Sequence, residues 1–538
     1  MNNKPILLKN GLIIDGTGAP SYRGNVLVEN GLIKEISREP IDAAGAETVE
    51  CSDQAVSPGF IDMHSHNDWF MPSSEKFEYF SPFIEQGITT YVTGNCGFGA
   101  SVFKPGSEHI ELLEDNLFKA GHHGLTWRSM DEYFQHIEQK GLHQNIATLT
   151  GHGTTRASLR GYDAAPVKPE ERKEILSLIE ESMEQGSRGV SLGLGYAPDI
   201  FTTFEEQKEV AETVKKHNGF ITSHVRAFST ISGAYPVKPF GQPHNLKALE
   251  EMITLARETG VRMHISHLIF VGKKTWKTLD KALSLIDKAI DEGLDIHFDT
   301  YAHHCGATVI TGILPEWFMA EVPAAYENKK LLRQAKNLMN LSFALLGFNA
   351  DDMQLTAANH PDMDQYNGMF VSNIAQDRKE KNFKTYIELA KKSDSTARML
   401  LHKYSNREII LELMRHRASH FMTDAWIEPE GIQNPGAFGC FPRFLQLARE
   451  SGVISLEETV HKLTGKNAAQ AGINDRGILK KGLAADITIF DEKNITDNTT
   501  LENSSARPTG IDMVFLNGKK ILEKGEAIPG VFAGSVIR

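Results

Sequence analysis

Eight short apolar runs, each followed by a stretch with helical periodicity, constrain the fold more than any other feature of this sequence. The runs span residues 55–66, 89–96, 145–153, 189–196, 219–226, 261–268, 294–301 and 419–425. One intervening stretch begins at a Thr203…Glu206 capping box and ends at Gly219, as a helix does. Strands that alternate with helices form parallel sheets. Eight such units predict an α/β fold of the (β/α)8 TIM-barrel type, whose active site lies at the carboxyl ends of the strands.

The two ends of the chain differ from this middle part, because they consist of short β-rich runs punctuated by NG and DG turns, as in hairpins. We expect one domain from residues 1–57 together with 475–538, and a barrel domain over 58–474. More than a hundred residues separate the last two strand-like runs, which is too long for a plain connection. We therefore expect an inserted subdomain or lid at about 325–415, and an irregular surface excursion is the alternative.

Composition and charge narrow the class of protein. Hydrophobic residues make up 41% of the chain and charged residues 23%, which is ordinary for a globular enzyme. The net charge of −12, with no Lys/Arg-rich run, argues against a nucleic-acid partner. No apolar stretch approaches the roughly 18 residues of a membrane span, and the N-terminus has no signal-peptide pattern. Four cysteines in 538 residues do not form a disulfide framework and indicate a reducing, cytoplasmic compartment. We expect a small-molecule partner and a monomer or small homo-oligomer.

The ends of the predicted strands carry side chains that bind metals or transfer protons. These residues are His64, His66, Cys96, His224, His267 and Asp424. Residues two apart on a strand point to the same side, so His64 and His66 both face the barrel mouth. Imidazole, thiolate and carboxylate together suit Zn²⁺, and a thiolate favours zinc over magnesium. One such residue alone is ordinary, but six at the same rim predict a zinc site.

Other histidines and the cysteine have competing interpretations. Five histidines in predicted loops or helices are expected to face solvent: His122, His123, His303, His304 and His416. Cys96 could instead be a small buried hydrophobe or a catalytic nucleophile. We favour ligation, because a thiolate among several potential ligands would be captured by the metal. Loss of activity with full zinc occupancy in Cys96→Ser would revive the nucleophile hypothesis.

Sequence motifs extend this interpretation to a family. They are PGFIDMHSHND, GNCGFG, GLGYAPDIFTTFEE, HVR, HISHL, FGCFPRFL, LTGKNAAQAGINDRGILKKGLAADITIFD and GIDMVFLNGKKI. In these motifs and their order, over most of the chain outside about 325–415, the sequence resembles the N-acyl-D-amino-acid deacylase (D-aminoacylase) branch of the amidohydrolase superfamily. The resemblance implies a distorted TIM-type barrel and a small β-sandwich domain formed by the N- and C-terminal segments.

Matched residue by residue, the resemblance implies five metal ligands: His64, His66, Cys96, His224 and His267. Cys96 would take the bridging place that a carboxylated lysine holds in many relatives. The implied cofactor is Zn²⁺, with a tight ion at Cys96, His224 and His267. Whether a second, weaker ion binds at His64, His66 and Cys96 is left open. Asp424 would be the catalytic carboxylate that acts as general base and acid.

Three further residues are candidates for substrate contact. Tyr196 and Tyr301 match tyrosines that line the substrate pocket of this family, and Arg226 matches the arginine of its His-x-Arg motif. For the two tyrosines, packing inside the barrel is the alternative to substrate contact. For Arg226 the alternative is a structural ion pair, and the sequence does not separate the two.

Two positions depart from the family pattern. The lysine that usually follows the strand-six histidine by two residues is Ile269, and the arginine of a His-Pro-Arg triplet is Gly436. In the family these two cations help to hold the α-carboxylate of the substrate. Either other cations hold it here, such as Arg226, Lys273 or Lys274, or the substrate has no free carboxylate at that point.

The resulting hypothesis is a zinc-dependent amidohydrolase that hydrolyses the amide C–N bond of an N-acyl-D-amino acid or a related N-acyl compound. The alternative on the same site is hydrolysis of a cyclic amide or imide, a neutral amide or a carbamate. A third hypothesis is a catalytically inactive barrel that binds metal or ligand as a sensor or scaffold. It is disfavoured because all six positions at the rim carry competent residue types.

Overall fold

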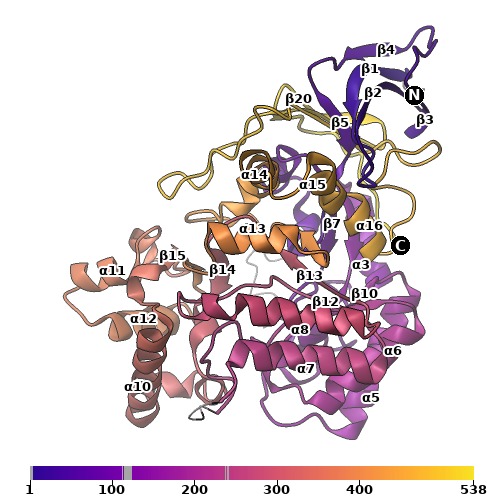
Figure 1. The fold of residues 1–538 in the computed structure, drawn as a ribbon. Coiled ribbons are helices and arrows are strands. Elements are labelled where there is room, and N and C mark those ends of the chain that lie inside the picture. Colours follow the sequence, from indigo (N-terminus) through magenta and orange to yellow (C-terminus); the bar gives the residue numbers. More distant parts are fainter. Residues whose placement is uncertain (1–3, 112, 114–123, 237, 239–240) are drawn as a thin grey trace.

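The computed structural model describes residues 4–111, 113, 124–236, 238 and 241–538, and parallel strands alternate with helices through the middle of the chain (Figure 1). A six-stranded parallel sheet has the order β17 (Ser419–Phe421), β13 (Ile296–Thr300), β12 (Arg262–Ile265), β11 (Phe220–His224), β10 (Gly189–Gly193) and β9 (Thr150–Gly151). A three-stranded parallel sheet has the order β6 (Phe60–Asp62), β7 (Ile88–Thr93) and β8 (Asn145–Thr148). The α/β fold class expected from the sequence is therefore confirmed.

The two sheets are connected to each other at both of their edges. β8 and β9 are separated only by Leu149, whose N–H donates to the carbonyl of Thr93 on β7 at 2.9 Å. At the other edge, the N–H of Asp424, shortly after β17, donates to the carbonyl of His64, shortly after β6, at 3.0 Å. The carboxyl ends of β6 and β17 are thereby held side by side.

Helices that follow the strands cover the outside of the six-stranded sheet. α5 (Pro169–Glu184), α6 (Phe204–Lys216), α7 (His244–Thr259) and α8 (Leu279–Asp291) lie side by side in chain order (Figure 1). The predicted start of α6 is confirmed, since the Thr203 side chain accepts from the N–H of Glu206 at 3.2 Å. Across the residues that the structure describes, no helix combines the length and the apolar character needed to cross a bilayer.

Both ends of the chain form a separate nine-stranded sheet (Figure 1). Its strands are β1 (Ile6–Ile13), β2 (Tyr22–Glu29), β3 (Leu32–Ser37), β4 (Glu47–Glu50), β5 (Ala55–Pro58), β18 (Ile487–Phe490), β19 (Ile511–Leu516), β20 (Lys519–Glu523) and β21 (Glu526–Ala527). β5 pairs antiparallel with β18, with Val56 opposite Ile489, and this pairing joins the two ends of the chain.

The junction between β5 and β6 corrects one expectation. The apolar run over 55–66 predicts a single strand, but the structure divides it at Gly59 into two strands that belong to different sheets. A Cβ at Gly59 would lie 2.3 Å from Oγ1 of Thr89, so a side chain at this position would disrupt the packing against β7. The prediction failed because both strands are buried and equally apolar, and the run shows no change in composition where the chain changes sheets.

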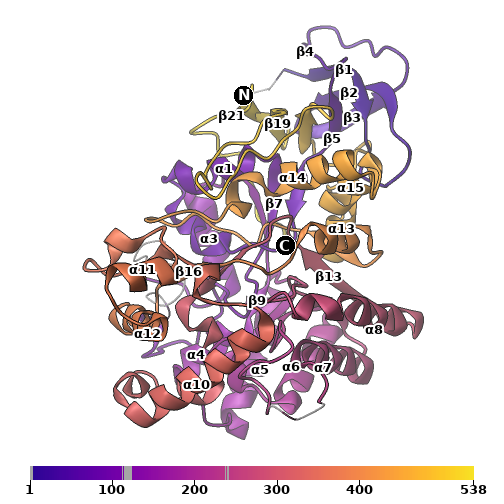
Figure 2. The same cartoon turned by 60° about the vertical axis from the view of Figure 1, so that its left-hand side comes forward.

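Residues 306–401, between β13 and β17, form an insertion lobe beside the parallel sheets (Figure 2). Its strands form an antiparallel sheet in the order β14 (Gly306–Val309), β16 (Arg398–Leu401) and β15 (Met353–Ala357). Its longer helices are α10 (Lys329–Leu346), α11 (Val371–Asp377) and α12 (Asn382–Lys392). The lobe consists of regular elements, and its first strand begins at Gly306.

The histidines expected at the surface have mixed outcomes. His304 is exposed, as expected, whereas His303 is only 5% exposed, so the expectation for it is wrong. His303 is buried because it lies against the loop of Asp497, whose Oδ2 is 3.7 Å from its Nε2. His416 is also largely buried, since its ring packs 5.2 Å from that of Phe298. His122 and His123 lie outside the described residues.

Candidate metal centre

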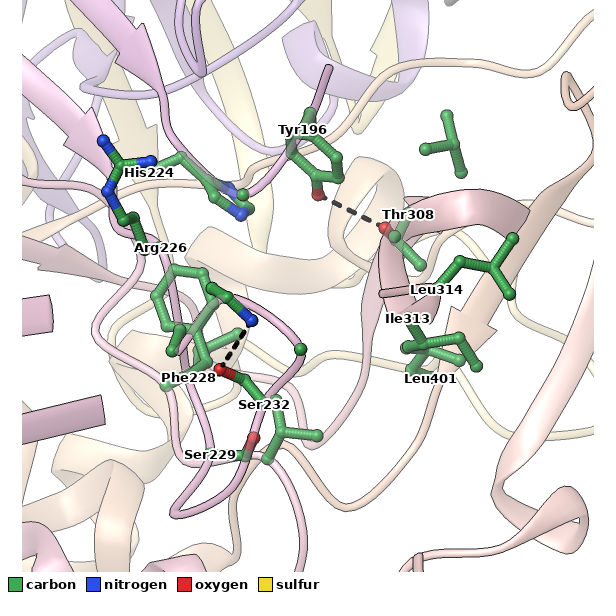
Figure 3. A pocket seen from close by; sticks show the side chains of 18 of the residues that line it. Tyr196, His224, Arg226, Phe228, Ser229, Ser232, Thr308, Ile313, Leu314 and Leu401 are labelled. Carbon is green, nitrogen blue, oxygen red and sulfur yellow. Dashed lines mark hydrogen bonds between the residues drawn. The ribbon is translucent and has the colours of Figure 1, made fainter. Parts of the chain in front are cut away.

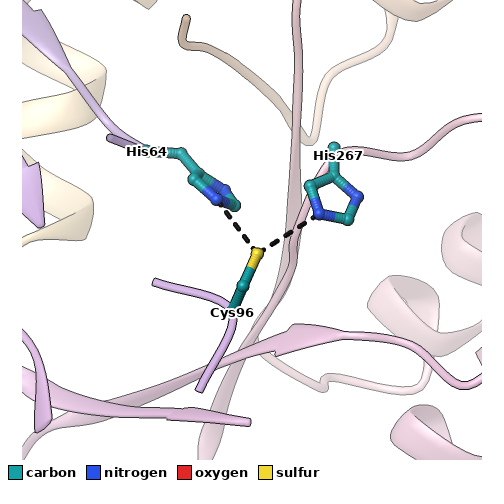
Figure 4. A group of neighbouring side chains, drawn as sticks. All are labelled: His64, Cys96 and His267. Atoms are coloured by element: carbon teal, nitrogen blue, oxygen red, sulfur yellow. Dashed lines mark hydrogen bonds between the residues drawn. The ribbon is translucent and has the colours of Figure 1, made fainter. Parts of the chain in front are cut away.

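The expected ligands meet where the parallel strands end. Sγ of Cys96 lies 3.3 Å from Nε2 of His64 and 3.4 Å from Nε2 of His267 (Figure 4). Nδ1 of His224 lies 2.9 Å from the same Nε2 of His267. All four side chains are buried. Residues from the ends of β6, β7, β11 and β12, far apart in the sequence, therefore form one cluster.

Asp424 completes the cluster on its other side. Its Oδ1 lies 3.4 Å from Nε2 of His64 and 3.5 Å from Nε2 of His66. There are thus two groups of three donor atoms, and the atoms of each group lie within 4.8 Å of one another. One group is His64, Cys96 and His267, and the other is His64, His66 and Asp424. We call the six residues the donor cluster: His64, His66, Cys96, His224, His267 and Asp424. The grouping differs from the predicted pair of sites, because His64 rather than Cys96 belongs to both groups.

Three residues of the donor cluster have a backbone conformation that L-amino acids rarely adopt. The φ angles are 55° at Cys96, 32° at His267 and 49° at Asp424. Each left-handed residue costs about 1–2 kcal/mol relative to the right-handed region. Each lies just beyond the end of its strand. Backbone strain of this kind concentrates at functional sites, where it holds side chains in place.

The electrostatics of the cluster suit a cation. Burial by itself would raise the pKa of the Cys96 thiol, but the imidazoles of His64 and His267 hold this pKa well below its usual value. Burial likewise opposes ionisation of Asp424, yet the charge of His64 brings the pKa of Asp424 below its usual value. The cluster therefore contains a thiolate and a carboxylate. Burial lowers the pKa of His224 to about 4, which keeps this imidazole neutral, the form that binds metals.

The distances also fit zinc. Zn–S bonds of about 2.3 Å and Zn–N bonds of about 2.0 Å at a tetrahedral angle place sulfur and nitrogen about 3.5 Å apart. The two separations from Cys96 Sγ, 3.3 and 3.4 Å, are close to this value. The residues present thus match a zinc site in donor type, charge and spacing.

Asp299, which the sequence analysis missed, supports the cluster from behind. Its Oδ2 lies 3.2 Å from Nδ1 of His64 and 3.0 Å from Nε2 of His264, and its Oδ1 accepts from the N–H of His267. A carboxylate that hydrogen-bonds the second nitrogen of a metal-binding imidazole fixes the orientation and tautomer of the ring. Asp299 lies one residue before the end of β13, so extending the search for polar residues at strand ends to the seventh strand would have found it.

The cluster opens into a cavity whose farther side is apolar (Figure 3). We call that side the apolar wall, and it consists of Val271, Leu314, Met339, Phe343, Leu346 and Phe348. Most of these residues belong to the insertion lobe, and three of them come from α10. Ile269 lines the same cavity, at the position where the family usually has a lysine.

The three residues expected to contact substrate also line this cavity. The Tyr196 ring lies 4.3 Å from that of His224, and its hydroxyl is 3.2 Å from Oγ1 of Thr308 (Figure 3). Tyr301 is buried, and its hydroxyl has no hydrogen-bond partner among the described residues. Arg226 is engaged elsewhere, because its Nε donates to Glu251 at 2.9 Å and its guanidinium also donates to backbone carbonyls. Its geometry favours the structural ion pair.

The other cations considered from the sequence do not reach the cavity. Lys273 and Lys274 are exposed and are not among its lining residues, and Nζ of Lys274 donates to the carbonyl of Ala344 at 3.2 Å. Gly436 begins α14 (Gly436–Ser451), and a Cβ there would lie 2.9 Å from the carbonyl oxygen of Thr423. An arginine could not occupy this position without a shift of the backbone.

Several known proteins are similar to this chain in sequence and fold. No protein-family model matches it. The D-aminoacylase of Alcaligenes xylosoxydans xylosoxydans is 26% identical over 550 residues, which cover 99% of this chain and 97% of the relative. A crystal structure of D-aminoacylase, which defines a subset of amidohydrolases, matches with a TM-score of 0.81 at 25% identity and 99% coverage of both chains. The chain is similar to D-aminoacylases over nearly its whole length. The resemblance found in the sequence is thereby confirmed.

Two further solved structures are similar to the chain in fold. The N-acyl-D-glutamate deacylase of Bordetella bronchiseptica matches with a TM-score of 0.80 at 24% identity, over the full length of both chains. That structure contains zinc and a phosphonate inhibitor that mimics the tetrahedral intermediate of its reaction. The L-hydantoinase of Arthrobacter aurescens matches less well, with a TM-score of 0.58 at 16% identity, and covers both chains fully. The curated relatives that match over nearly the whole chain are deacylases, so the cyclic-amide alternative is not favoured.

Proposed function

We propose that this chain is a zinc-dependent amidohydrolase that hydrolyses the amide C–N bond of an N-acyl-D-amino acid or a related N-acyl compound. The observation that carries the proposal is the donor cluster, in which four imidazoles, a thiolate and a carboxylate meet at the ends of parallel strands. The similarity to D-aminoacylase and to N-acyl-D-glutamate deacylase over nearly the whole chain supports this substrate class.

The proposal includes a closed but distorted (β/α)8 TIM-type barrel over residues 58–474 and a β-sandwich domain formed by 1–57 and 475–538. Two connections between the parallel sheets support the closed barrel. On one side the chain continues from β8 through Leu149 into β9, and on the other side the N–H of Asp424 donates to the carbonyl of His64. The pairing of β5 with β18 supports the joint terminal domain.

The ligands in this proposal are His64, His66, Cys96, His224 and His267. Cys96 suits a bridging place, since its Sγ is near the imidazoles of both His64 and His267. D-aminoacylase has a binuclear metal centre, which supports the proposal that a second, weaker ion can bind in this chain. Zinc held by these residues would supply a bound water whose pKa is lowered from 15.7 towards about 7, and Lewis acidity at the scissile carbonyl.

Asp424 is the proposed general base and acid. Its lowered pKa keeps the carboxylate ionised at neutral pH, so one oxygen can accept the proton of the attacking water. The same oxygen then gives this proton to the leaving nitrogen as the C–N bond breaks, so the nitrogen departs as an amine. The acyl group becomes a carboxylic acid, whose remaining proton passes to the amine or to solvent at neutral pH. Asp424 lines the cavity and its side chain remains 12% exposed, so it can reach a bound substrate.

The two cavity tyrosines are proposed to orient the substrate. The Tyr301 hydroxyl can donate to a substrate oxygen, since it is buried at the cavity wall without a hydrogen-bond partner among the described residues. Tyr196 packs against His224 and would hold both this ligand and the acyl group in place. Arg226 is assigned to the ion pair with Glu251 rather than to the substrate.

A substrate panel on zinc-loaded protein tests the proposal. It compares N-acetyl-D-amino acids with their L-isomers, a lactam, a cyclic imide and a carbamate, and it follows amine release. We expect turnover of the D-isomers above all others. Preferred ring opening would revive the cyclic-amide alternative, and no turnover of any compound would favour an inactive barrel.

Zinc content and activity, measured on the same preparation of Cys96→Ser, distinguish a metal ligand from a nucleophile at Cys96. If Cys96 is a ligand, Cys96→Ser loses zinc and activity together. If it is a nucleophile, the variant keeps its zinc and loses activity alone.

A further inference from the structure

Cys96 lies on a turn that directly follows β7 and that we call the Cys96 turn, residues 94–99. The φ angles of Gly94, Cys96 and Gly97 are 77°, 55° and 79°, so the backbone is left-handed at all three. A residue with a side chain, such as cysteine, keeps this conformation only where its surroundings hold it there. The position of the proposed thiolate ligand therefore depends on the contacts that hold the turn.

Ser191 closes the Cys96 turn from the sheet. Its Oγ accepts from the N–H of Gly97 at 2.9 Å and donates to the carbonyl of Gly94, so one buried hydroxyl joins the two arms of the turn on either side of Cys96. Ser191 lies on β10, which pairs in parallel with β11, and β11 ends at His224. The hydroxyl thus ties the Cys96 turn to the strand pair that also positions His224.

Thr154, on α4 (His152–Arg160), holds the same turn through two further hydrogen bonds. Its N–H donates to the carbonyl of Gly97 at 2.9 Å, and its Oγ1 accepts from the N–H of Gly99 at 3.1 Å. Together with Ser191 it satisfies both backbone groups of Gly97. Gly97 is buried, so the loss of either contact is costly.

Close packing also confines the Cys96 turn. A Cβ at Gly193 would lie 2.1 Å from the carbonyl oxygen of Cys96, so the turn rests directly on the end of β10. Oδ2 of Asp199 accepts from the N–H of Gly193 at 2.8 Å, and Nδ1 of His152 lies 2.7 Å from Oδ1 of the same carboxylate. Asp199 fills the space beside Gly97, where its Oδ2 would be only 2.6 Å from a Cβ. Packing therefore acts together with the two hydroxyl groups.

We propose that Ser191 and Thr154 are positioning residues for Cys96. Their hydroxyl groups hold the Cys96 turn in its left-handed conformation, which places the thiolate between the imidazoles of His64 and His267. The inference rests on the proposed function, because it concerns the orientation of a proposed zinc ligand. Both side chains lie outside the cavity wall formed by the described residues, so they act through Cys96 and not on the substrate.

The first test removes the hydroxyl of Ser191 and measures the metal site rather than turnover. In Ser191→Ala the N–H of Gly97 and the carbonyl of Gly94 lose their shared partner. Zinc affinity, measured by competition with a chelator of known affinity, should fall about 10- to 100-fold, the usual effect of losing a group that orients a ligand. In cobalt-loaded protein the charge-transfer absorption of the thiolate–cobalt bond should weaken, because Sγ of Cys96 is no longer held at bonding distance.

Thr222→Val is the matched control. Thr222 lies opposite Ser191 in the register of β10 and β11 and is also buried, but its hydroxyl has no hydrogen-bond partner among the described residues. This variant should keep the zinc affinity and the cobalt spectrum of the wild type. At the second position, Thr154→Val should weaken zinc binding, whereas Thr154→Ser keeps the hydroxyl and should bind zinc as the wild type does.

The outcomes separate this inference from the proposed function, because neither readout needs a substrate. If Ser191→Ala loses zinc affinity and Thr222→Val does not, the inference holds even where no compound is hydrolysed, and only the proposed function fails. If Ser191→Ala lowers the thermal midpoint but keeps the zinc affinity and the cobalt spectrum, or if both variants lose zinc equally, Ser191 has only a structural role and the inference is wrong. Thr154→Val compared with Thr154→Ser decides the question if Ser191→Ala does not fold.

Discussion

The donor cluster and the apolar wall face each other across one cavity, yet they are built in different ways. The donor cluster comes from the ends of parallel strands, is polar, and contains strained backbone at Cys96, His267 and Asp424. The apolar wall comes mostly from the insertion lobe and has ordinary helical backbone on α10. The fold thus separates the polar, donor-rich part of the cavity from its apolar part.

This difference has a physical basis. Parallel strands in a sheet fix their ends relative to one another through the backbone ladder, so six donors can be placed within a few ångströms. An apolar surface needs no such precision, because hydrophobic contacts are non-directional. The lobe can therefore vary in sequence and shape while the chemistry at the strand ends stays the same.

Removal of the metal should have the largest effect, and it should affect the donor cluster but not the apolar wall. Extended dialysis against a chelator should lower turnover at least about 1,000-fold, because the proposed water activation depends on bound zinc. Readdition of zinc should restore it, with metal content followed by elemental analysis. The shape of the apolar wall does not depend on the metal, so binding of an apolar substrate analogue should persist. Full turnover in metal-stripped protein would exclude the donor cluster as a zinc site.

Asp424→Asn separates catalysis from metal binding within the donor cluster. Turnover should fall about 100- to 10,000-fold, the usual contribution of a general acid–base group. Zinc content should stay near that of the wild type, because the five proposed ligands remain. The measurement is kcat together with metal content on the same preparation. Unchanged kcat would remove Asp424 from the mechanism.

Asp299→Asn tests the support behind the cluster. Loss of the carboxylate that faces His64 and His264 should weaken zinc affinity about 10- to 100-fold, as measured by competition with a chelator of known affinity. Asp295→Asn, at a half-exposed carboxylate just before the same strand, is the matched control and should leave the affinity unchanged. Equal affinities in both variants would mean that Asp299 has only a structural role.

Of these substitutions, Phe343→Ala should have the smallest effect on catalysis. It tests whether the apolar wall can be changed without changing the donor cluster. Truncation of this ring should change the ranking of kcat/KM among apolar substrates by about tenfold or less. Zinc content should be unaffected. Leu341→Ala, on the exposed face of the same helix, is the control. A loss of zinc in Phe343→Ala would show that the wall and the donor cluster are not independent.

The sequence was most informative where the fold repeats. The positions of the donor cluster follow from two rules, the alternation of strands with helices and the gathering of strand ends in a parallel fold. Asp299 obeys the same rules, but it lies inside its strand run rather than after it and was overlooked. The N-terminal cap of α6 was predicted because capping depends on neighbours only three residues apart.

Features that depend on long-range packing could not be predicted from the sequence. Nothing in the apolar run 55–66 indicates that Gly59 separates two sheets, because both strands are buried. The burial of His303 depends on a loop near Asp497, almost two hundred residues later in the chain. Ser191 drew no attention either, since a single serine inside a buried strand carries no pattern. Its contacts with the Cys96 turn result from the way the residues after β7 pack against β10.

The pairing of β5 with β18 also constrains how this molecule is made. On a ribosome, the N-terminal half of that sheet emerges long before β18 exists, so the apolar edge of β5 has no partner for most of translation. An open strand edge of this kind is a template for incorrect pairing. The sheet can therefore be completed only when strands from both ends of the chain are present. Until the last strands have been synthesised, the open edge of β5 must be kept from incorrect pairing.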